Sequence, residues 1–322
     1  MDNNVVHAPR APHAFPRRIL LATIGLAPQI ITETLFALTV KGRPPFVPTE
    51  IHVITTVEGH HRVQLQLLDP STAMLARFAA EFDAPSLANA LTPEHIHTIV
   101  GPDGQPLDDI TADGHNAAMA DLITSVVRNL TRDETAALHV SIAGGRKAMG
   151  FLLGYAISLY GRPQDRLSHV LVDPPFEGHP EFFYPPKTPR VLMTNDKRPR
   201  PINTADARVT LADIPFVRLR QGMHQDLLDG RGSYSEVVRR MQETFASPRL
   251  AIDVPCQRLL AGGLEIELTP LQFTFYAWLA ECRRTLQDGD GAAHWTTIDP
   301  EQLLAIYAQL PDITVAKVDI QR

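Results

Sequence analysis

One short segment limits the possible folds of this chain more than any other. Leu138–Ile142 is largely apolar and partly β-branched, which is typical of a buried strand in a parallel sheet. A glycine pair, Gly144–Gly145, follows at once, and a helix is predicted from Lys147. Glycine permits a tight turn close to a ligand, and a helix directs its free N–H groups at the space above the strand. With Arg146 and Lys147 at the same point, the segment predicts an α/β fold with a phosphate site.

A second segment near the start of the chain repeats this order of parts. Arg18–Thr23 predicts a buried strand, Gly25 ends it, and Pro28 occupies a favoured position for starting a helix over 28–40. In an open parallel sheet, ligands bind beyond the carboxyl ends of the strands, where the strand order reverses. The two glycine turns meet there if the two strands are neighbours. If they are not, both turns are ordinary tight connections.

Strand-like and helical patterns alternate along the first part of the chain. The predicted strands are 19–23, 51–56, 95–100, 138–142 and 167–172. The predicted helices are 28–40, 71–82, 116–130 and 147–160. This alternation predicts a doubly wound, mainly parallel, Rossmann-like sheet, and a further strand region at 209–219 is expected to return to it.

The pattern changes after a proline-rich stretch, and it divides the chain into four parts. Residues 1–17 are expected to be a loose tail, 18–220 a ligand-binding α/β domain and 221–249 a connecting helix. Residues 250–322 predict a smaller α+β unit, with a hairpin around Gly262–Gly263 and a helix that begins at Thr269. A hairpin followed by a helix resembles the opening of a winged helix. The sequence shows no basic recognition helix or terminal wing, so neither a complete winged helix nor DNA binding is supported.

Composition and charge exclude several classes of protein. A net charge of −6 argues against broad nucleic-acid coating, although local positive charge still permits binding of a small polyanion. Cys256 and Cys282 are the only cysteines, which fits a reducing cytoplasm without disulfides. No apolar run reaches the ~18 residues of a membrane span, and residues 1–17 lack the apolar core of a signal peptide. We therefore expect a cytoplasmic protein without membrane contact.

The histidines do not follow a recognisable metal-binding spacing. His60–His61 and the pair His95 and His97 are the closest groupings among 13 histidines. Neither grouping has a Cys, Asp or Glu partner at a zinc-site spacing. No metal and no cofactor are therefore predicted.

Two motifs resemble the signatures of the CRISPR-associated Rossmann fold (CARF) superfamily. Residues 22–29 (Ala-Thr-Ile-Gly-Leu-Ala-Pro-Gln), with Thr-Glu-Thr-Leu from residue 32, resemble the first signature. Ser-x-x-Gly-Gly-Arg-Lys-x-Met over 141–149 resembles the second. The segments 53–56 and 106–110 resemble parts of the ring nucleases of this superfamily. The likeness covers about residues 18–220 and is nearest to the ring nucleases of type III CRISPR systems.

The resemblance implies a homodimer that binds cyclic tetra-adenylate across its twofold axis. Ring nucleases cut this messenger, without a metal, into linear di-adenylates that end in a 2′,3′-cyclic phosphate, which switches off type III CRISPR signalling. By the same resemblance, Lys147 is catalytic and stabilises charge on the phosphate, while Gln29 orients the attacking 2′-OH. The other implied ligand contacts are Gly25, Leu26, Ala27, Pro28, Thr55, Thr56, Glu58, Ser141, Gly144, Gly145, Arg146 and Met149. Thr55, Thr56 and Glu58 fit a polar turn after a buried strand equally well.

One departure from the family pattern keeps a second interpretation open. Some relatives have serine where this chain has Ala27, so one hydroxyl is missing from the loop. The alternative is a non-catalytic sensor of cyclic oligoadenylate that regulates a partner protein or a promoter. A dinucleotide-dependent enzyme fits less well, because no further glycine follows Gly25 at the G-x-G-x-x-G spacing.

Overall fold

The protein, seen in a computed structural model, comprises two compact units, Met1–Ser235 and Glu236–Arg322. The structure describes residues 10–223, 225–230, 232–245, 250–261, 264–285 and 299–311. No helix within these ranges is both long enough and apolar enough to cross a membrane.

A six-stranded sheet organises the first unit, in the order β3-β2-β1-β4-β5-β8. Its strands are β1 (Arg17–Thr23), β2 (Glu50–Thr55), β3 (Ile96–Thr98), β4 (Ala136–Ser141), β5 (Arg166–Val172) and β8 (Val209–Asp213). The first five strands are parallel, and β8 pairs with β5 in the antiparallel direction. The chain moves outward from β1 to β3 and then continues on the other side of β1 at β4. The strand order therefore reverses at β1 and β4, and the predicted Rossmann-like sheet is confirmed.

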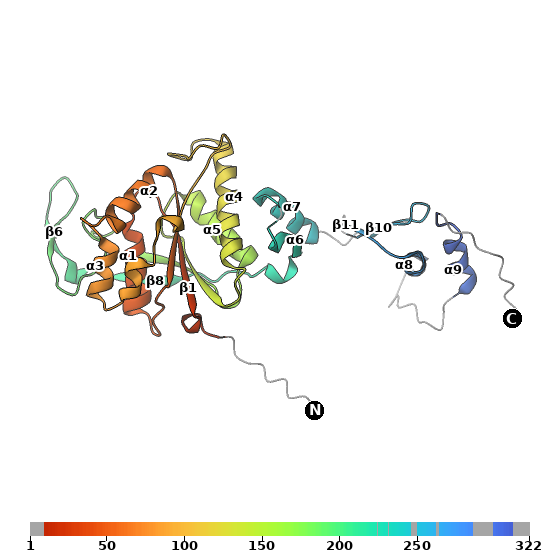
Figure 1. Ribbon diagram of the computed structural model, residues 1–322, viewed down its shortest axis with the longest axis horizontal. Helices are drawn as coiled ribbons and strands as arrows, with labels where there is room; N and C mark the ends of the chain where they lie inside the picture. The colour runs from red at the N-terminus through yellow and green to blue at the C-terminus, as the bar shows by residue number, and fades with distance from the viewer. Residues whose placement is uncertain are drawn as a thin grey trace, which may run out of the picture. The chain divides into compact units, whose positions relative to one another are not determined.

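Helices cover both faces of this sheet, with α1 and α3 on one side and α4 and α5 on the other (Figure 1). The helices of the first unit are α1 (Gln29–Leu35), α2 (Val57–Val63), α3 (Met74–Glu81), α4 (Asp113–Leu130), α5 (Lys147–Tyr160) and α6 (Gln225–Leu228). The helices α1 and α2 each continue into a π-helical segment, Phe36–Lys41 and Gln64–Leu68. The sheet is buried between these layers, and all six residues of β4 are buried.

Two details differ from the sequence-based expectations. Helix α2, directly after β2, was not predicted, because its short Val-Glu-Gly-His-His sequence has no clear apolar stripe. The expected strand region 209–219 is shorter, since β8 ends at Asp213. Beyond the sheet, β6 (Val191–Met193) and β7 (Pro201–Asn203) form a separate antiparallel pair.

The amino ends of β4 and β5 are held by a buried ion pair. Arg162 and Asp165 are 1% and 0% exposed, with Arg162 Nη2 and Asp165 Oδ1 3.0 Å apart. Asp165 also accepts hydrogen bonds from the backbone N–H groups of Arg162, at 2.7 Å, and Leu138, at 2.9 Å. The carboxylate is thus fully satisfied where it replaces missing ladder bonds at the start of two strands.

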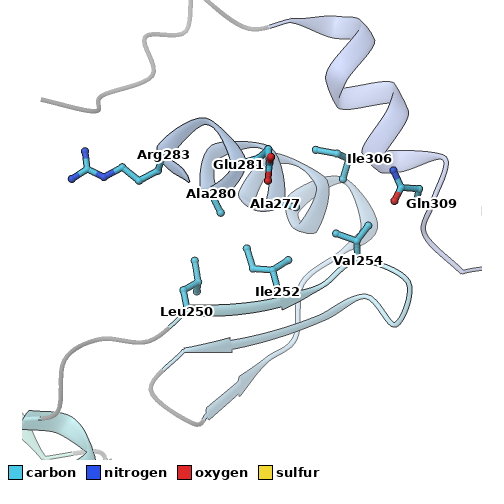
Figure 2. A pocket seen from close by; sticks show the side chains of 9 residues that line it. All are labelled: Leu250, Ile252, Val254, Ala277, Ala280, Glu281, Arg283, Ile306 and Gln309. Carbon is cyan, nitrogen blue, oxygen red and sulfur yellow. The ribbon is translucent and has the colours of Figure 1, made fainter. Parts of the chain in front are cut away.

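Helix α7 (Tyr234–Phe245) spans the division between the units, and a small α+β unit follows. Its three-stranded antiparallel sheet has the order β11-β10-β9, from β9 (Leu250–Asp253), β10 (Arg258–Ala261) and β11 (Leu264–Ile266). Helices α8 (Pro270–Thr285) and α9 (Pro300–Tyr307) pack with it. Figure 2 shows a pocket between β9 and these two helices, lined by apolar residues such as Ile252 and Ala277 and by the polar residues Glu281, Arg283 and Gln309.

Candidate functional site

The two glycine turns meet at the carboxyl edge of the sheet. They follow β1 and β4, which are adjacent parallel strands. A Cβ atom added to Gly25 would lie 3.3 Å from the Cα of Gly145, so the two backbones are in direct contact. Gly145 has a φ of +81°, which an L side chain rarely adopts, and a Cβ on Gly144 would lie 2.5 Å from the carbonyl oxygen of Thr23. The Thr23 hydroxyl donates to the Gly144 carbonyl at 2.8 Å, which fastens one loop to the other strand.

A third loop, between β2 and α2, contacts the first glycine loop. The Thr55 hydroxyl donates to the carbonyl oxygen of Ile24 at 2.8 Å. Helix α2 approaches so closely that a Cβ on Gly59 would lie 2.7 Å from the carbonyl oxygen of Gly25. Helices α1, α2 and α5 therefore all begin at one edge, where their partial positive charges favour an anion.

The two cations after the glycine pair have different surroundings. Arg146 forms a bidentate ion pair with Asp109, with Arg146 Nε 2.7 Å from Asp109 Oδ1. This pairing lowers the pKa of the Asp109 carboxyl below its usual value. The side chain of Lys147 is exposed and has no ion-pair or hydrogen-bond partner within the described part of the chain. Lys147 is thus the unpaired cation of the turn, while the charge of Arg146 is already balanced.

Gln29 contributes an unpaired polar atom from the first residue of α1. Its side chain is buried, and its Oε1 atom has no hydrogen-bond partner among the described residues. Glu33, one turn later, is also buried, and burial and the nearby Glu177 raise its pKa to about 8. Buried polar groups are normally satisfied, so an orphan acceptor beside an anion-binding edge suits a ligand hydroxyl.

The remaining expected contacts separate by exposure. Thr55, Ser141 and Met149 are buried, and the Ser141 hydroxyl lies 3.4 Å from that of Thr34. Met149 packs beneath the glycine pair, where its Sδ accepts the Arg146 N–H at 3.4 Å. These three residues lie below the surface and support the loops. The residues at least partly exposed at this edge are Gly25, Leu26, Ala27, Thr56, Glu58, Gly145, Arg146 and Lys147, whereas Pro28 and Gly144 are buried.

The structure adds two side chains to the site that the sequence did not assign. Arg62 pairs with Glu58 at 2.8 Å and also reaches the Leu26 carbonyl at 3.4 Å, which links α2 to the first glycine loop. Asp109 lies in the segment 106–110 that resembles ring nucleases, but nothing in its spacing indicates a partner 37 residues later. Pairing of this kind is decided by tertiary structure.

Comparisons with known proteins identify a family and show remote similarity to solved structures. A family model described as CRISPR-associated protein NE0113 matches residues 27–246, more than half of the chain. A comparison with curated proteins gave no match. Among solved structures, Enterococcus italicus Csm6 bound to cyclic hexa-2′-fluoro-hexa-dAMP is similar at 12% identity and a TM-score of 0.29. That similarity covers 49% of this chain and 34% of the Csm6 chain, so the match spans about a third of the length of Csm6.

Proposed function

The chain belongs to the family of CRISPR-associated protein NE0113, and on that premise we propose that its carboxyl-edge site binds a cyclic oligoadenylate. One observation carries the proposal: the contact between Gly25 and Gly145 joins both CARF-like signatures in one site. The joined loops place the starts of α1 and α5 beside the unpaired ammonium of Lys147. Three elements that favour phosphate thus meet at one point.

We propose a homodimer as the binding form and cyclic tetra-adenylate as the ring. One chain offers one unpaired lysine at this edge to a ligand with four phosphates, whereas a twofold dimer offers two, arranged symmetrically. Leu26 and Phe151 are 58% and 68% exposed, the first in the glycine loop and the second one turn after Lys147. Phe151 also stacks on Tyr155, with ring centroids 6.3 Å apart. Exposed apolar groups beside the site are a suitable surface for a second copy.

The proposed reaction is cleavage by the ring's own 2′-OH. The 2′-oxygen attacks the adjacent phosphorus, the bond to the 5′-oxygen breaks, and a 2′,3′-cyclic phosphate forms. The 2′-OH gives up its proton to solvent, and the leaving 5′-oxygen takes one from solvent. Lys147 stabilises the charge that develops on the phosphate oxygens. Gln29 Oε1 is buried and unpaired among the described residues, so its side chain must turn towards the edge before it accepts the 2′-OH and holds it in line. No metal enters these steps.

A non-catalytic sensor is the second candidate, and Ala27 is the observation that favours it. This residue is partly exposed in the loop between Gly25 and Gln29, so a serine hydroxyl at this position would be accessible to a ligand. In the sensor, the same site binds the ring without cutting it, and binding regulates a partner protein or a promoter.

One assay distinguishes the two candidates. The full-length protein is incubated in excess over cyclic tetra-adenylate in the presence of EDTA, and the products are separated by chromatography. Linear di-adenylate supports the ring nuclease. Intact ring that stays bound to the protein supports the sensor, and no binding of the ring refutes both.

Stoichiometry tests the dimer separately. Calorimetry should give one ring per two chains, and light scattering should give a dimer in the presence of the ring. The ring should raise the melting temperature, because it binds the folded state alone. Rising salt should weaken the affinity by screening the phosphates from Lys147. One ring per chain, or a monomer with ligand bound, contradicts the proposed geometry.

A further inference from the structure

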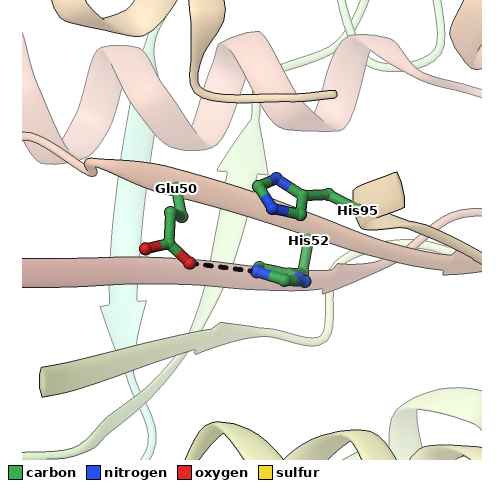
Figure 3. A group of neighbouring side chains, drawn as sticks. All are labelled: Glu50, His52 and His95. Atoms are coloured by element: carbon green, nitrogen blue, oxygen red, sulfur yellow. Dashed lines mark hydrogen bonds and ion pairs between the residues drawn. The ribbon is translucent and has the colours of Figure 1, made fainter. Parts of the chain in front are cut away.

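Three residues with metal-binding side chains gather near the amino end of β2. Glu50 and His52 lie on this strand, and His95 comes from the turn that precedes β3. Figure 3 shows the imidazole of His95 lying over that of His52, with the Glu50 carboxylate beside them. The two ring centroids are 4.1 Å apart, and one ligand atom from each of the three residues lies within 4.8 Å of the other two. We propose that Glu50, His52 and His95 bind a divalent transition metal ion, with Zn²⁺ as the expected ion.

The donor set fits this class of metal. Two imidazoles and one carboxylate are borderline ligands of the kind that zinc accepts, and three protein ligands leave a fourth position for water. A small movement of the three side chains would bring their atoms to the ~2 Å distances of zinc ligands. The side chain of His52 is 8% exposed and that of Glu50 is 25% exposed, so an ion could enter from solvent while the site stays largely enclosed.

Neighbouring groups orient each ligand. His52 Nδ1 lies 3.0 Å from His97 Nε2, and His95 Nδ1 lies 3.3 Å from the Ala90 carbonyl. When each Nδ1 carries the proton and donates it to these acceptors, both Nε2 atoms present a lone pair, which is the usual arrangement of metal-bound histidines. His52 Nε2 lies 3.4 Å from Glu50 Oε2, a long distance for a hydrogen bond. In this assignment Nε2 carries no proton, and the metal would lie between these two atoms.

Arg17 binds the Glu50 carboxylate but leaves a lone pair free on each of its oxygens. Its Nε and Nη2 atoms lie 2.7 and 2.8 Å from the two oxygens of Glu50. Each carboxylate oxygen has a second lone pair for a metal. Asp133, 3.2 Å from Arg17 Nη1, offsets the arginine charge that would otherwise repel a cation.

The site would fasten the edge of the sheet and take no part in phosphate chemistry. Strand β3 has three residues and, among the described strands, pairs with β2 alone. A metal between His95 and β2 would hold this strand, which leads into the loop that carries Asp109. His52 lies three residues before the carboxyl end of β2, about 10 Å along the strand from the edge where the glycine turns lie. This inference is therefore independent of the proposed reaction.

The sequence spacing does not indicate this cluster, because His95 lies more than 40 residues beyond His52. The expectation of no metal came from the absence of a local motif. Parallel pairing of β2 and β3 brings the distant histidine next to the strand.

The test is zinc titration of the full-length protein after tag removal and EDTA treatment. Calorimetry should give one Zn²⁺ per chain, and saturating Zn²⁺ should raise the melting temperature. Co²⁺ in place of Zn²⁺ should give the intense visible absorption of a four- or five-coordinate ion. His95→Gln, at a half-buried position, should weaken Zn²⁺ binding at least ~10²-fold, and His97→Gln should weaken it ~10- to 100-fold as a loss of ligand orientation.

His13→Gln is the matched control, because His13 is exposed and has no part in the cluster. It should bind Zn²⁺ as the unaltered protein does. The proposal is overturned if Zn²⁺ added to the unaltered protein gives no binding heat in calorimetry and no change in melting temperature. It is equally overturned if His95→Gln binds Zn²⁺ as tightly as the His13→Gln control. Melting in EDTA shows whether each variant folds, so a folding failure is recognised without reference to metal binding.

Discussion

Two buried carboxylates, one at each end of the same sheet, have opposite surroundings. Asp165, at the amino end of β5, accepts hydrogen bonds from Leu138 and from the guanidinium and N–H of Arg162. Glu33, in the helix that starts at the carboxyl edge, forms no ion pair or hydrogen bond through its carboxyl group within the described residues, and its pKa is raised to about 8. The amino end is thus closed and satisfied, whereas the carboxyl edge keeps unpaired groups. Unpaired groups lower stability and are what a ligand site requires.

Replacing each carboxylate with its amide tests this contrast, and Asp165→Asn should have the larger effect. The change leaves the buried Arg162 guanidinium without its counter-charge, so the free energy of unfolding should fall by about 3–5 kcal/mol. Urea unfolding followed by circular dichroism measures it. Glu134→Gln is the control, because its ion pair with Arg220 is exposed and should contribute less than about 1 kcal/mol. Equal losses in the two variants would contradict a special role for the buried pair.

Glu33→Gln should raise the free energy of unfolding at neutral pH, the opposite of the change expected for Asp165→Asn. The folded state holds the Glu33 proton up to a pH of about 8, whereas the unfolded chain releases it near 4.5. The unfolded state therefore binds fewer protons between these values, and stability falls as the pH rises through them. At pH 7 the amide should stabilise the fold by about 3 kcal/mol, with little effect at pH 4. Unfolding of both proteins across this range checks the slope, and a pH-independent difference would argue against the raised pKa.

Lys147→Ala should affect cleavage and leave folding almost unchanged. Removal of one charge-stabilising donor should slow single-turnover cleavage of cyclic tetra-adenylate at least ~10²-fold. The melting temperature should stay the same, because the side chain is exposed and unpaired within the described part of the chain. Lys197→Ala removes an exposed lysine from the loop between β6 and β7 and serves as the control. Equal cleavage rates in the two variants would show that Lys147 takes no part in the reaction.

Gln29→Leu should have the smallest effect on stability, and it should change stability and cleavage in opposite directions. Loss of a buried, unpaired acceptor should raise the free energy of unfolding by about 1 kcal/mol. Cleavage should nevertheless slow, because the 2′-OH loses its orienting acceptor. Gln66→Leu is the matched control, since its Oε1 is also buried and unpaired among the described residues. That variant should gain similar stability and cut the ring at the normal rate; slower cleavage there as well would remove the special role of Gln29.

The order of buried runs, glycines and helical stripes determined most of the fold. Each of the five parallel strands was expected within a few residues of its position, because strands buried on both faces leave a local signal. Lys147 begins α5 as predicted, since glycines before a helical stripe mark a turn regardless of the rest of the chain. The same local signals failed for α2, whose seven residues lack an apolar stripe and are held by contacts to other loops.

The sequence by itself determined which residues lie at strand ends, and the tertiary structure decided which of them meet. Adjacency of β1 and β4 placed Gly25 against Gly145, and β2 beside β3 placed His52 beneath His95. Long-range pairing also bound Arg146 to Asp109 and left Lys147 free within the described residues, although the two cations are neighbours in sequence. Local propensities act over a few residues, whereas ion pairs and orphaned groups depend on strand order and burial. For that reason the sequence indicated the turn, and only the folded sheet distinguished its paired cation from its unpaired one.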